Sequence, residues 1–177
     1  STLKLPKSQG GFATLGNVLQ QHGYQSAFIY GGVANFDNMR GFYQSNGFTQ
    51  VIEQQDFKQP VFLGNWGVSD EDWVQKAHDT FTQWQIQQPE KPFVAVMMST
   101  SNHDPFEFPV GRVQPYEQPL HTRHNAMQYA DYAIGKFAQL ARQSNYYDNT
   151  VFVVVADHDA RVYGDELLPV KHFHIPA

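Results

Sequence analysis

The chain has 177 residues, of which 41% are hydrophobic and 15% aromatic, so it can build a core and is not a disordered or low-complexity segment. Its 12 Lys and Arg are scattered among 17 Asp and Glu for a formal net charge of -5, which argues against nucleic acid and anionic membrane surfaces as partners. The absence of cysteine excludes disulfides, thiolate metal sites and a cysteine nucleophile.

Helix-like and strand-like segments alternate along the first half of the chain. Leu15, Val18 and Leu19 recur at helical spacing, and the apolar run that ends at Tyr30 is typical of a short buried strand. In chain order the patterns predict a helix over 14–22, a strand over 26–30, a short helix over 38–46, a small edge strand over 51–52 and a Pro-bearing surface loop over 54–67.

The second half contains the clearest periodicities. Ser69 followed by Asp72 resembles a capping box and predicts a helix that begins at Ser69 and ends near Gln88. The patterns further predict a strand over 93–98, a Pro-bearing loop over 105–119, a helix over 124–144 and a strand over 151–156. The last of these segments is apolar and β-branched almost throughout, so we expect Val153 and Val155 to be core residues.

Apolar strands separated by helices predict an α/β fold with a mostly parallel central sheet and helices on both faces. In such sheets ligands bind at the carboxyl ends of the strands. Polar groups that can bind metals or anions follow all three predicted apolar strands, in the segments 31–40, 99–105 and 157–161. We therefore expect these segments to share one sheet edge.

Asp157 and His158 come directly after the last predicted strand. A carboxylate and an imidazole can converge there on one cation such as Zn, Mn or Mg. The alternative is that Asp157 caps the following turn and His158 is merely polar. We expect both side chains to face the same cleft as His103.

His103 and Arg40 are candidates for binding an oxyanion. A His103 imidazole could hold a phosphate or sulfate oxygen or protonate a leaving group, although a contact with Asp104 in a tight turn would also account for it. The Arg40 guanidinium suits bidentate oxyanion binding, but Arg40 could equally be a solvated helix residue. The chain has no Gly-x-Ser-x-Gly elbow and no phosphate-binding glycine loop after Tyr30, which argues against a serine hydrolase and a nucleotide site.

Seven motifs together resemble the sulfatase-like phosphoglycerol transferases of the alkaline phosphatase superfamily, the group of the lipoteichoic acid synthases and glucan phosphoglycerol transferases. They cover nearly the whole chain in order and comprise Tyr30-Gly31-Gly32, Phe36–Phe42, Asn46-Gly47-Phe48, Gly67–Glu71, Thr100–Phe106 with Tyr129–Phe137, and Val155–His158. The resemblance implies an alkaline phosphatase/sulfatase-like fold. It also implies a Thr or Ser nucleophile that acts on a divalent metal, Mn, Mg or Zn.

By this resemblance Asp157 and His158 are metal ligands, and His103 is a substrate-binding histidine. Arg40 lies where lipoteichoic acid synthases carry a Trp-Asn-Arg phosphate-binding segment. Here that segment reads Asp37-Asn38-Met39-Arg40, without Trp and with the Arg displaced by one, which suggests a substrate other than polyglycerol phosphate.

The resemblance also implies that residues 1–177 are the C-terminal portion of a catalytic domain whose nucleophile and early acidic ligand precede Ser1. A processed or tagged complete domain is the alternative. The chain is then expected to be a partial domain with little activity of its own. Its parent would be membrane-anchored, with the catalytic domain on the periplasmic or extracellular face of a bacterial inner membrane.

The expected substrate is a phospholipid- or glucan-type phosphoglycerol compound, or a sulfate or phosphate ester, and the expected reaction is transfer or hydrolysis. Two alternatives stay open. One is a non-catalytic α/β binding or assembly module, and the other is a true arylsulfatase. The second would need a Cys/Ser-x-Pro-x-Arg segment, which is absent from this sequence.

Overall fold

The computed structural model describes residues 9–158 and 174–177, and the chain divides into two compact units, 1–147 and 148–177. The helices of the first unit are α1 (Leu15–Gln20), α2 (Met39–Ser45), α3 (Asp70–Gln87) and α4 (Arg123–Arg142). Its strands are β1 (Gln25–Tyr30), β2 (Gln50–Ile52), β3 (Leu63–Gly64), β4 (Gly67–Val68) and β5 (Phe93–Met98). Short 3-10 turns span Phe36–Asn38, Gln54–Asp56 and Tyr147–Asn149. No helix in the described ranges is both long and apolar enough to cross a bilayer.

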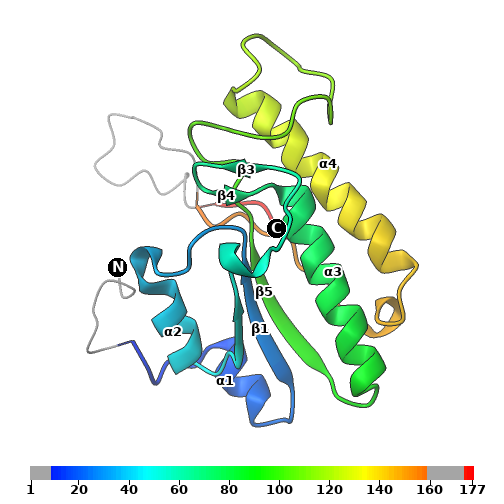
Figure 1. Ribbon diagram of the computed structural model, residues 1–177. Helices are drawn as coiled ribbons and strands as arrows, with labels where there is room; N and C mark the ends of the chain where they lie inside the picture. Colours follow the sequence, from blue (N-terminus) through cyan, green and yellow to red (C-terminus); the bar gives the residue numbers. More distant parts are fainter. Residues whose placement is uncertain (1–8, 159–173) are drawn as a thin grey trace. The chain divides into compact units, whose positions relative to one another are not determined.

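A three-stranded sheet in the order β2-β1-β5 lies at the centre of the first unit (Figure 1). Both pairings are parallel, with Ala27 of β1 opposite Gln50 of β2 and Ala95 of β5. A separate antiparallel hairpin joins β3 and β4 within the region predicted as a loop. The predicted α/β fold with a parallel sheet is therefore confirmed for this unit.

The two faces of β1 bury alternate residues, as the two-residue period of a strand requires. Ala27 and Ile29 pack against the cluster formed by α3 and the end of α4, whereas Phe28 and Tyr30 pack with Met39 and its neighbours on the opposite face. All four β1 side chains are buried. Helices thus cover both faces of the sheet, as the sequence predicts.

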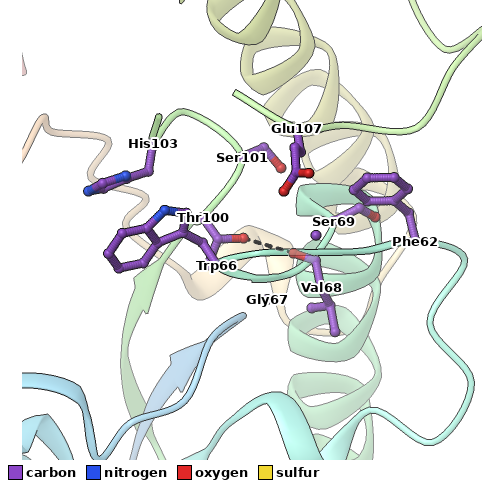
Figure 2. Close-up of a pocket in the computed structure, with 10 residues that line it drawn as sticks. Phe62, Trp66, Gly67, Val68, Ser69, Thr100, Ser101, His103 and Glu107 are labelled. Atoms are coloured by element: carbon purple, nitrogen blue, oxygen red, sulfur yellow. Dashed lines mark hydrogen bonds between the residues drawn. The ribbon is translucent and has the colours of Figure 1, made fainter. Parts of the chain in front are cut away.

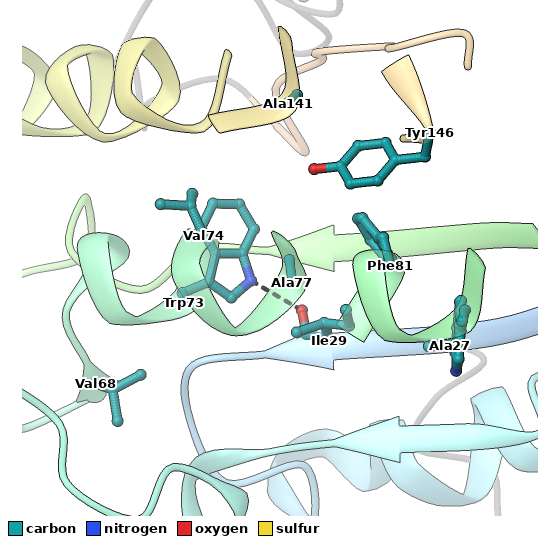
Figure 3. Packing of buried hydrophobic residues seen from close by; sticks show 10 residues of the cluster. Ala27, Ile29, Val68, Trp73, Val74, Ala77, Phe81, Ala141 and Tyr146 are labelled. Carbon is teal, nitrogen blue, oxygen red and sulfur yellow. Dashed lines mark hydrogen bonds between the residues drawn. The ribbon is translucent and has the colours of Figure 1, made fainter. Parts of the chain in front are cut away.

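The apolar stripe of α3 packs into the core on its face of the sheet (Figure 3). Trp73, Ala77, Phe81 and Trp84 are buried, as their helical spacing predicts. The Trp73 indole also donates a 3.0 Å hydrogen bond from Nε1 to the backbone oxygen of Ile29, so it ties the helix to β1 as well as filling the core.

Ser69 caps α3, but the predicted capping box is only half formed. The Ser69 side chain accepts a 3.3 Å hydrogen bond from the backbone nitrogen of Asp72. The Asp72 carboxylate accepts from the Ser69 hydroxyl at 2.6 Å and from the backbone nitrogens of Val61 and Phe62, but not from the Ser69 backbone nitrogen as a capping box requires. The backbone nitrogen of Ser69 donates to Phe62 at 3.0 Å. The loop before α3 therefore supplies the acceptor for the Ser69 backbone nitrogen that the Asp72 side chain would supply in a complete capping box.

We expect Ser69→Ala to lower the free energy of unfolding by about 1 kcal/mol, because the partly buried backbone amide of Asp72 at the start of α3 loses its acceptor. Denaturant unfolding monitored by circular dichroism measures this change. Thr80→Ala is the matched control, since it removes a hydroxyl from the same helix that only donates to the Lys76 carbonyl. It should change stability by less than about 0.5 kcal/mol. Equal losses in the two variants would contradict the cap assignment.

The second unit is described over 148–158 and 174–177, and within those ranges residues 151–156 form no strand. The predicted strand is therefore wrong, and so is the core position of two valines, since Val153 is 75% and Val155 54% exposed. A β-branched run favours extended backbone, but a strand also needs a neighbour for its hydrogen bonds. A backbone hydrogen bond joins the Ala156 nitrogen to the Pro176 oxygen at 3.3 Å. The apolar pattern of residues 151–156 indicates a preference for burial, but it does not indicate which strand would pair with this segment.

Candidate functional site

The segments that follow β1 and β5 begin at the same edge of the sheet. These strands are parallel neighbours, and their last residues, Tyr30 and Met98, are partners in the register. Residues 31–40 and 99–106 therefore leave the carboxyl edge side by side, which is where α/β sheets bind ligands. Two of the three predicted polar segments thus share one edge within this unit, and His103 lies in one of them.

Three glycines let the β3–β4 hairpin cross this edge at close range. A side chain on Gly67, whose φ is +138°, would place its Cβ 2.1 Å from the Gly31 oxygen, and one on Gly32 would lie 2.4 Å from the Trp66 oxygen. The Val68 nitrogen donates to the Gly31 oxygen at 2.9 Å. The Gly31-Gly32 pair after β1 therefore serves close backbone packing, consistent with its lack of phosphate-loop features.

Asp70, the first residue of α3, holds the start of the loop that carries His103. Its Oδ1 accepts hydrogen bonds from the backbone nitrogens of Thr100 and Ser101 at 3.2 and 3.1 Å, and the Thr100 hydroxyl donates to the Val68 oxygen at 2.8 Å. Burial raises the pKa of the Asp70 carboxyl, although the bonds from Ser101 and Thr100 act in the opposite direction. The loop after β5 is thus fixed to both the helix and the hairpin.

The His103 imidazole lies against the Trp66 indole with ring centroids 3.8 Å apart (Figure 2). Its Nδ1 is 2.9 Å from the Asp104 backbone oxygen, and Trp66 Nε1 donates to that same oxygen at 2.7 Å. Phe36, from the segment after β1, meets the edge of the indole at 5.4 Å. His103 is exposed, so a ligand can reach the ring.

A small pocket opens beside this pair. Figure 2 shows Trp66 and His103 on one side of it and Phe62 and Glu107 on the other. Glu107 Oε2 accepts a 2.6 Å hydrogen bond from the Asn65 nitrogen at the hairpin turn. Sequence reasoning did not single out Trp66, Asp70 or Glu107 as site residues. The sequence signal that could have indicated Trp66 is its position next to Gly67, one of the glycines that allow the hairpin to pack closely on Gly31 and Gly32.

Arg40 contacts a buried carboxylate. Its Nη2 lies 2.5 Å from Glu53 Oε1, and Glu53 Oε2 accepts a hydrogen bond from the Ala34 nitrogen at 2.5 Å. Glu53 is 5% exposed, whereas the Arg40 side chain is 29% exposed. The geometry therefore gives Arg40 a part in fixing the segment after β1, and its role in substrate binding stays a prediction.

Asp157 and His158 belong to the second unit and are both exposed. The His158 nitrogen donates to Asp157 Oδ1 at 3.0 Å, and His158 Nε2 lies 3.4 Å from Asp157 Oδ2. One carboxylate and one imidazole are suitable donors for a divalent cation. Among residues 9–158 and 174–177, no group of three or more metal-binding side chains occurs. The pair thus fits part of a metal site, and the expectation that it shares a cleft with His103 stays a prediction.

Glu71, in the first turn of α3, ties the loop 105–122 to α3 and α4. Its carboxylate is nearly buried and pairs with Arg112 at 2.7 Å and with Lys136 of α4 at 3.0 Å. Tyr129 and Tyr132 of α4 also approach it, at 3.4 and 3.3 Å. Burial acts to raise the pKa of Glu71, but the hydrogen bonds and charges of Lys136 and Arg112 outweigh it, so the pKa is lowered.

We expect Glu71→Gln to reduce the free energy of unfolding by about 1–3 kcal/mol at neutral pH, because two cations lose their partner. A lowered folded-state pKa contributes stability that is present above the unfolded value of about 4.3 and is lost as the pH falls through the folded value. The difference between wild type and variant should therefore shrink on acidification. Chemical unfolding at a series of pH values measures it. A difference that stays constant down to pH values below the folded pKa would contradict the ion-pair assignment.

Comparison with known proteins shows which family the chain resembles. The chain is 29% identical over 152 residues to phosphoglycerol transferase I of Xanthomonas campestris pv. campestris, a match that covers 81% of this chain and 21% of that protein. It is 23% identical over 158 residues to the lipoteichoic acid synthase-like YvgJ of Bacillus subtilis, covering 86% of this chain and 25% of that protein. The chain thus spans about a quarter or less of the length of these curated relatives.

Solved structures agree on the fold. A protein in the alkaline phosphatase superfamily from Vibrio parahaemolyticus matches 99% of this chain and 42% of its own, with a TM-score of 0.93 and 49% identity. The lipoteichoic acid synthase LtaP from Listeria monocytogenes has the same fold, with a TM-score of 0.77 and 24% identity over 96% of this chain and 42% of its own. The sulfatase family model matches residues 1–176, and the chain therefore belongs to the sulfatase family.

Proposed function

We propose that the chain is part of an extracytoplasmic catalytic domain that transfers phosphoglycerol from a phospholipid donor to a glucan-type or related hydroxyl acceptor. The observation that carries the proposal is the placement of His103, exposed and held from two sides, at the carboxyl edge of β1 and β5. Family membership and the names of the curated relatives support a phosphoglycerol substrate. The short match to those relatives supports the view that residues 1–177 are one portion of a longer domain.

In this proposal His103 binds a peripheral oxygen of the phosphoryl ester. Its Nδ1 is already engaged by the Asp104 carbonyl, so Nε2 is the nitrogen that remains for a ligand. Arg40 is the second candidate for this role, and Glu53 would orient its guanidinium in addition to fixing the segment after β1.

Asp157 and His158 would contribute two ligands to a divalent metal, Mn, Mg or Zn, with the remaining ligands supplied from outside the described residues. Their donor types fit, since the carboxylate offsets the positive charge and the imidazole supplies a directional nitrogen. When bound, the metal would polarise the ester oxygens and favour ionisation of the nucleophilic hydroxyl.

The proposed reaction is a two-step displacement. A Thr or Ser hydroxyl outside residues 1–177 attacks phosphorus, the bond to the diacylglycerol oxygen breaks, and a covalent phosphoglycerol ester forms. The acceptor hydroxyl then attacks the same phosphorus and releases the enzyme oxygen. His103 holds the ester oxygens in both steps, so the phosphoryl group stays oriented while its partner changes.

The experiment is a comparison of substrates with the full-length protein that contains this chain. Phosphatidylglycerol labelled in its headgroup is incubated with enzyme, Mn²⁺ and a periplasmic-type glucan, and glucan-bound label is counted. An aryl sulfate ester is offered in parallel, because the family also suggests sulfate esters. Glucan labelling without sulfate release is the expected result. Sulfate release alone would favour an arylsulfatase, and no turnover with either would favour a non-catalytic binding module.

A further inference from the structure

We propose that Trp66 is a positioning residue for His103: it holds the imidazole by its ring face and through the shared Asp104 carbonyl, with the proton on Nδ1 and Nε2 left for the substrate. This inference rests on the proposed function in assigning the substrate contact to Nε2. The orientation of the ring and the place of its proton can be tested without it.

The first observation is the double contact between the two side chains. The ring centroids are 3.8 Å apart at an interplanar angle of 37°, so the indole covers the imidazole and restricts its rotation (Figure 2). Trp66 Nε1 also donates to the Asp104 oxygen at 2.7 Å. One residue therefore controls both the ring of His103 and the peptide group that follows it.

The second observation is that the Asp104 oxygen faces two ring nitrogens. His103 Nδ1 lies 2.9 Å from it, and a carbonyl oxygen can only accept, so Nδ1 must carry a proton. Nε2 is then the nitrogen whose role can change. It accepts from a hydroxyl when the ring is neutral and donates to an oxyanion when the ring is protonated.

The third observation is that Trp66 is itself rigidly placed. The residue after it, Gly67, packs so closely on Gly31 that a Cβ would lie 2.1 Å from the Gly31 oxygen, and the Val68 nitrogen bonds that same oxygen at 2.9 Å. The ring of Phe36 meets the indole edge at a centroid distance of 5.4 Å and an angle of 89°. The segment after β1 therefore supports the indole, which in turn supports His103 in the segment after β5.

The test compares Trp66→Leu and Trp66→Phe in the full-length protein, with Trp73→Phe as the matched control. Trp73 also donates its indole N–H to a backbone carbonyl, that of Ile29, but it does so in the core. Histidine is labelled with ¹⁵N, His103 is assigned from the signal lost in His103→Gln, and the ¹⁵N shifts report which ring nitrogen carries the proton. Glycerol phosphate binding is measured by calorimetry on the same samples.

Wild type and Trp73→Phe should show His103 with its proton on Nδ1 and equal affinity for glycerol phosphate. Trp66→Leu should show a mixture of both tautomers and about tenfold weaker binding, and Trp66→Phe about threefold weaker binding, because the indole hydrogen bond alone is lost. A neutral wild-type ring with its proton on Nε2 and none on Nδ1, or unchanged shifts and affinity in Trp66→Leu, would overturn the proposal. If Trp66→Leu does not fold, unchanged shifts and affinity in Trp66→Phe overturn it.

The same samples separate this inference from the proposed function. If His103→Gln binds glycerol phosphate as tightly as wild type, His103 is not a substrate ligand and that part of the proposed function fails. The tautomer measurement in the Trp66 variants still decides whether the indole positions the ring.

Discussion

Under the proposed function, replacing His158 by alanine in the full-length protein is expected to abolish transfer and to strip the metal. A divalent site of about four ligands that loses one nitrogen donor binds its ion far more weakly, and the polarising charge is lost with it. The role stays a prediction; in the structure the His158 imidazole and the Asp157 carboxylate lie side by side, with Nε2 3.4 Å from Oδ2, so two donors of the expected types are adjacent. Elemental analysis of purified protein, combined with turnover of labelled phosphatidylglycerol, measures both effects.

His124→Ala is the matched control for this prediction. His124 is also an exposed histidine next to a carboxylate, that of Glu117 at 2.9 Å, but it lies at the start of α4 and is not a predicted ligand. It should retain metal and full activity. A His158→Ala enzyme with wild-type metal content and turnover would remove His158 from the metal site.

Replacing His103 by alanine is expected to lower kcat/KM by about 10²–10³ while the metal content stays at the wild-type level. The reason is that removing one donor to the charged oxygens of a transition state costs about this much in other enzymes. The loop keeps its anchors in this variant. Asp70 still accepts hydrogen bonds from the backbone of the loop, and the Thr100 hydroxyl still donates to the Val68 oxygen of β4. The loss should therefore reflect the missing imidazole and not an unfolded loop.

The two histidine variants together test the assignment of roles. Metal retained in His103→Ala and lost in His158→Ala is the predicted pattern. The reverse pattern would exchange their roles, and a wild-type rate for His103→Ala would show that His103 is not a ligand of the ester.

A helical stripe of apolar residues predicts α3 correctly, and the short edge strand predicted over 51–52 is found as β2. The stripe of Trp73, Ala77, Phe81 and Trp84 predicts α3, and all four side chains are buried in the structure. The hairpin β3–β4 was missed because its strands have only two residues each, too few for any period to show. Its position depends on glycine contacts between segments far apart in the sequence, which a pattern read along the chain does not reveal.

In the site, too, residues with a local sequence signal could be predicted, whereas residues that the fold brings in from elsewhere in the chain could not. His103 could be singled out because a histidine after a buried strand is a local signal. Trp66 and Asp70 act on it from elsewhere in the chain, through a ring contact at 3.8 Å and two backbone hydrogen bonds, so their importance emerges only in three dimensions. Arg40 illustrates the converse: its residue type suggests an anion site, whereas in the structure its guanidinium contacts the carboxylate of Glu53.

The failed prediction over 151–156 has a different cause. Its β-branched residues do favour extended backbone, but composition cannot supply a neighbouring strand. In the described part of its unit the run stays exposed, with Val151 at 88%. The assignment of Asp157 and His158 therefore no longer draws support from a strand before them and depends on their donor chemistry and on the family.

The most direct measurement is a crystal structure of the full-length enzyme with glycerol phosphate and Mn²⁺. The account predicts the phosphate at the carboxyl edge of β1 and β5, with one of its oxygens about 3 Å from His103 Nε2 and the Trp66 indole still against the ring. A phosphate bound elsewhere, with no ligand atom within hydrogen-bond reach of His103, would contradict it.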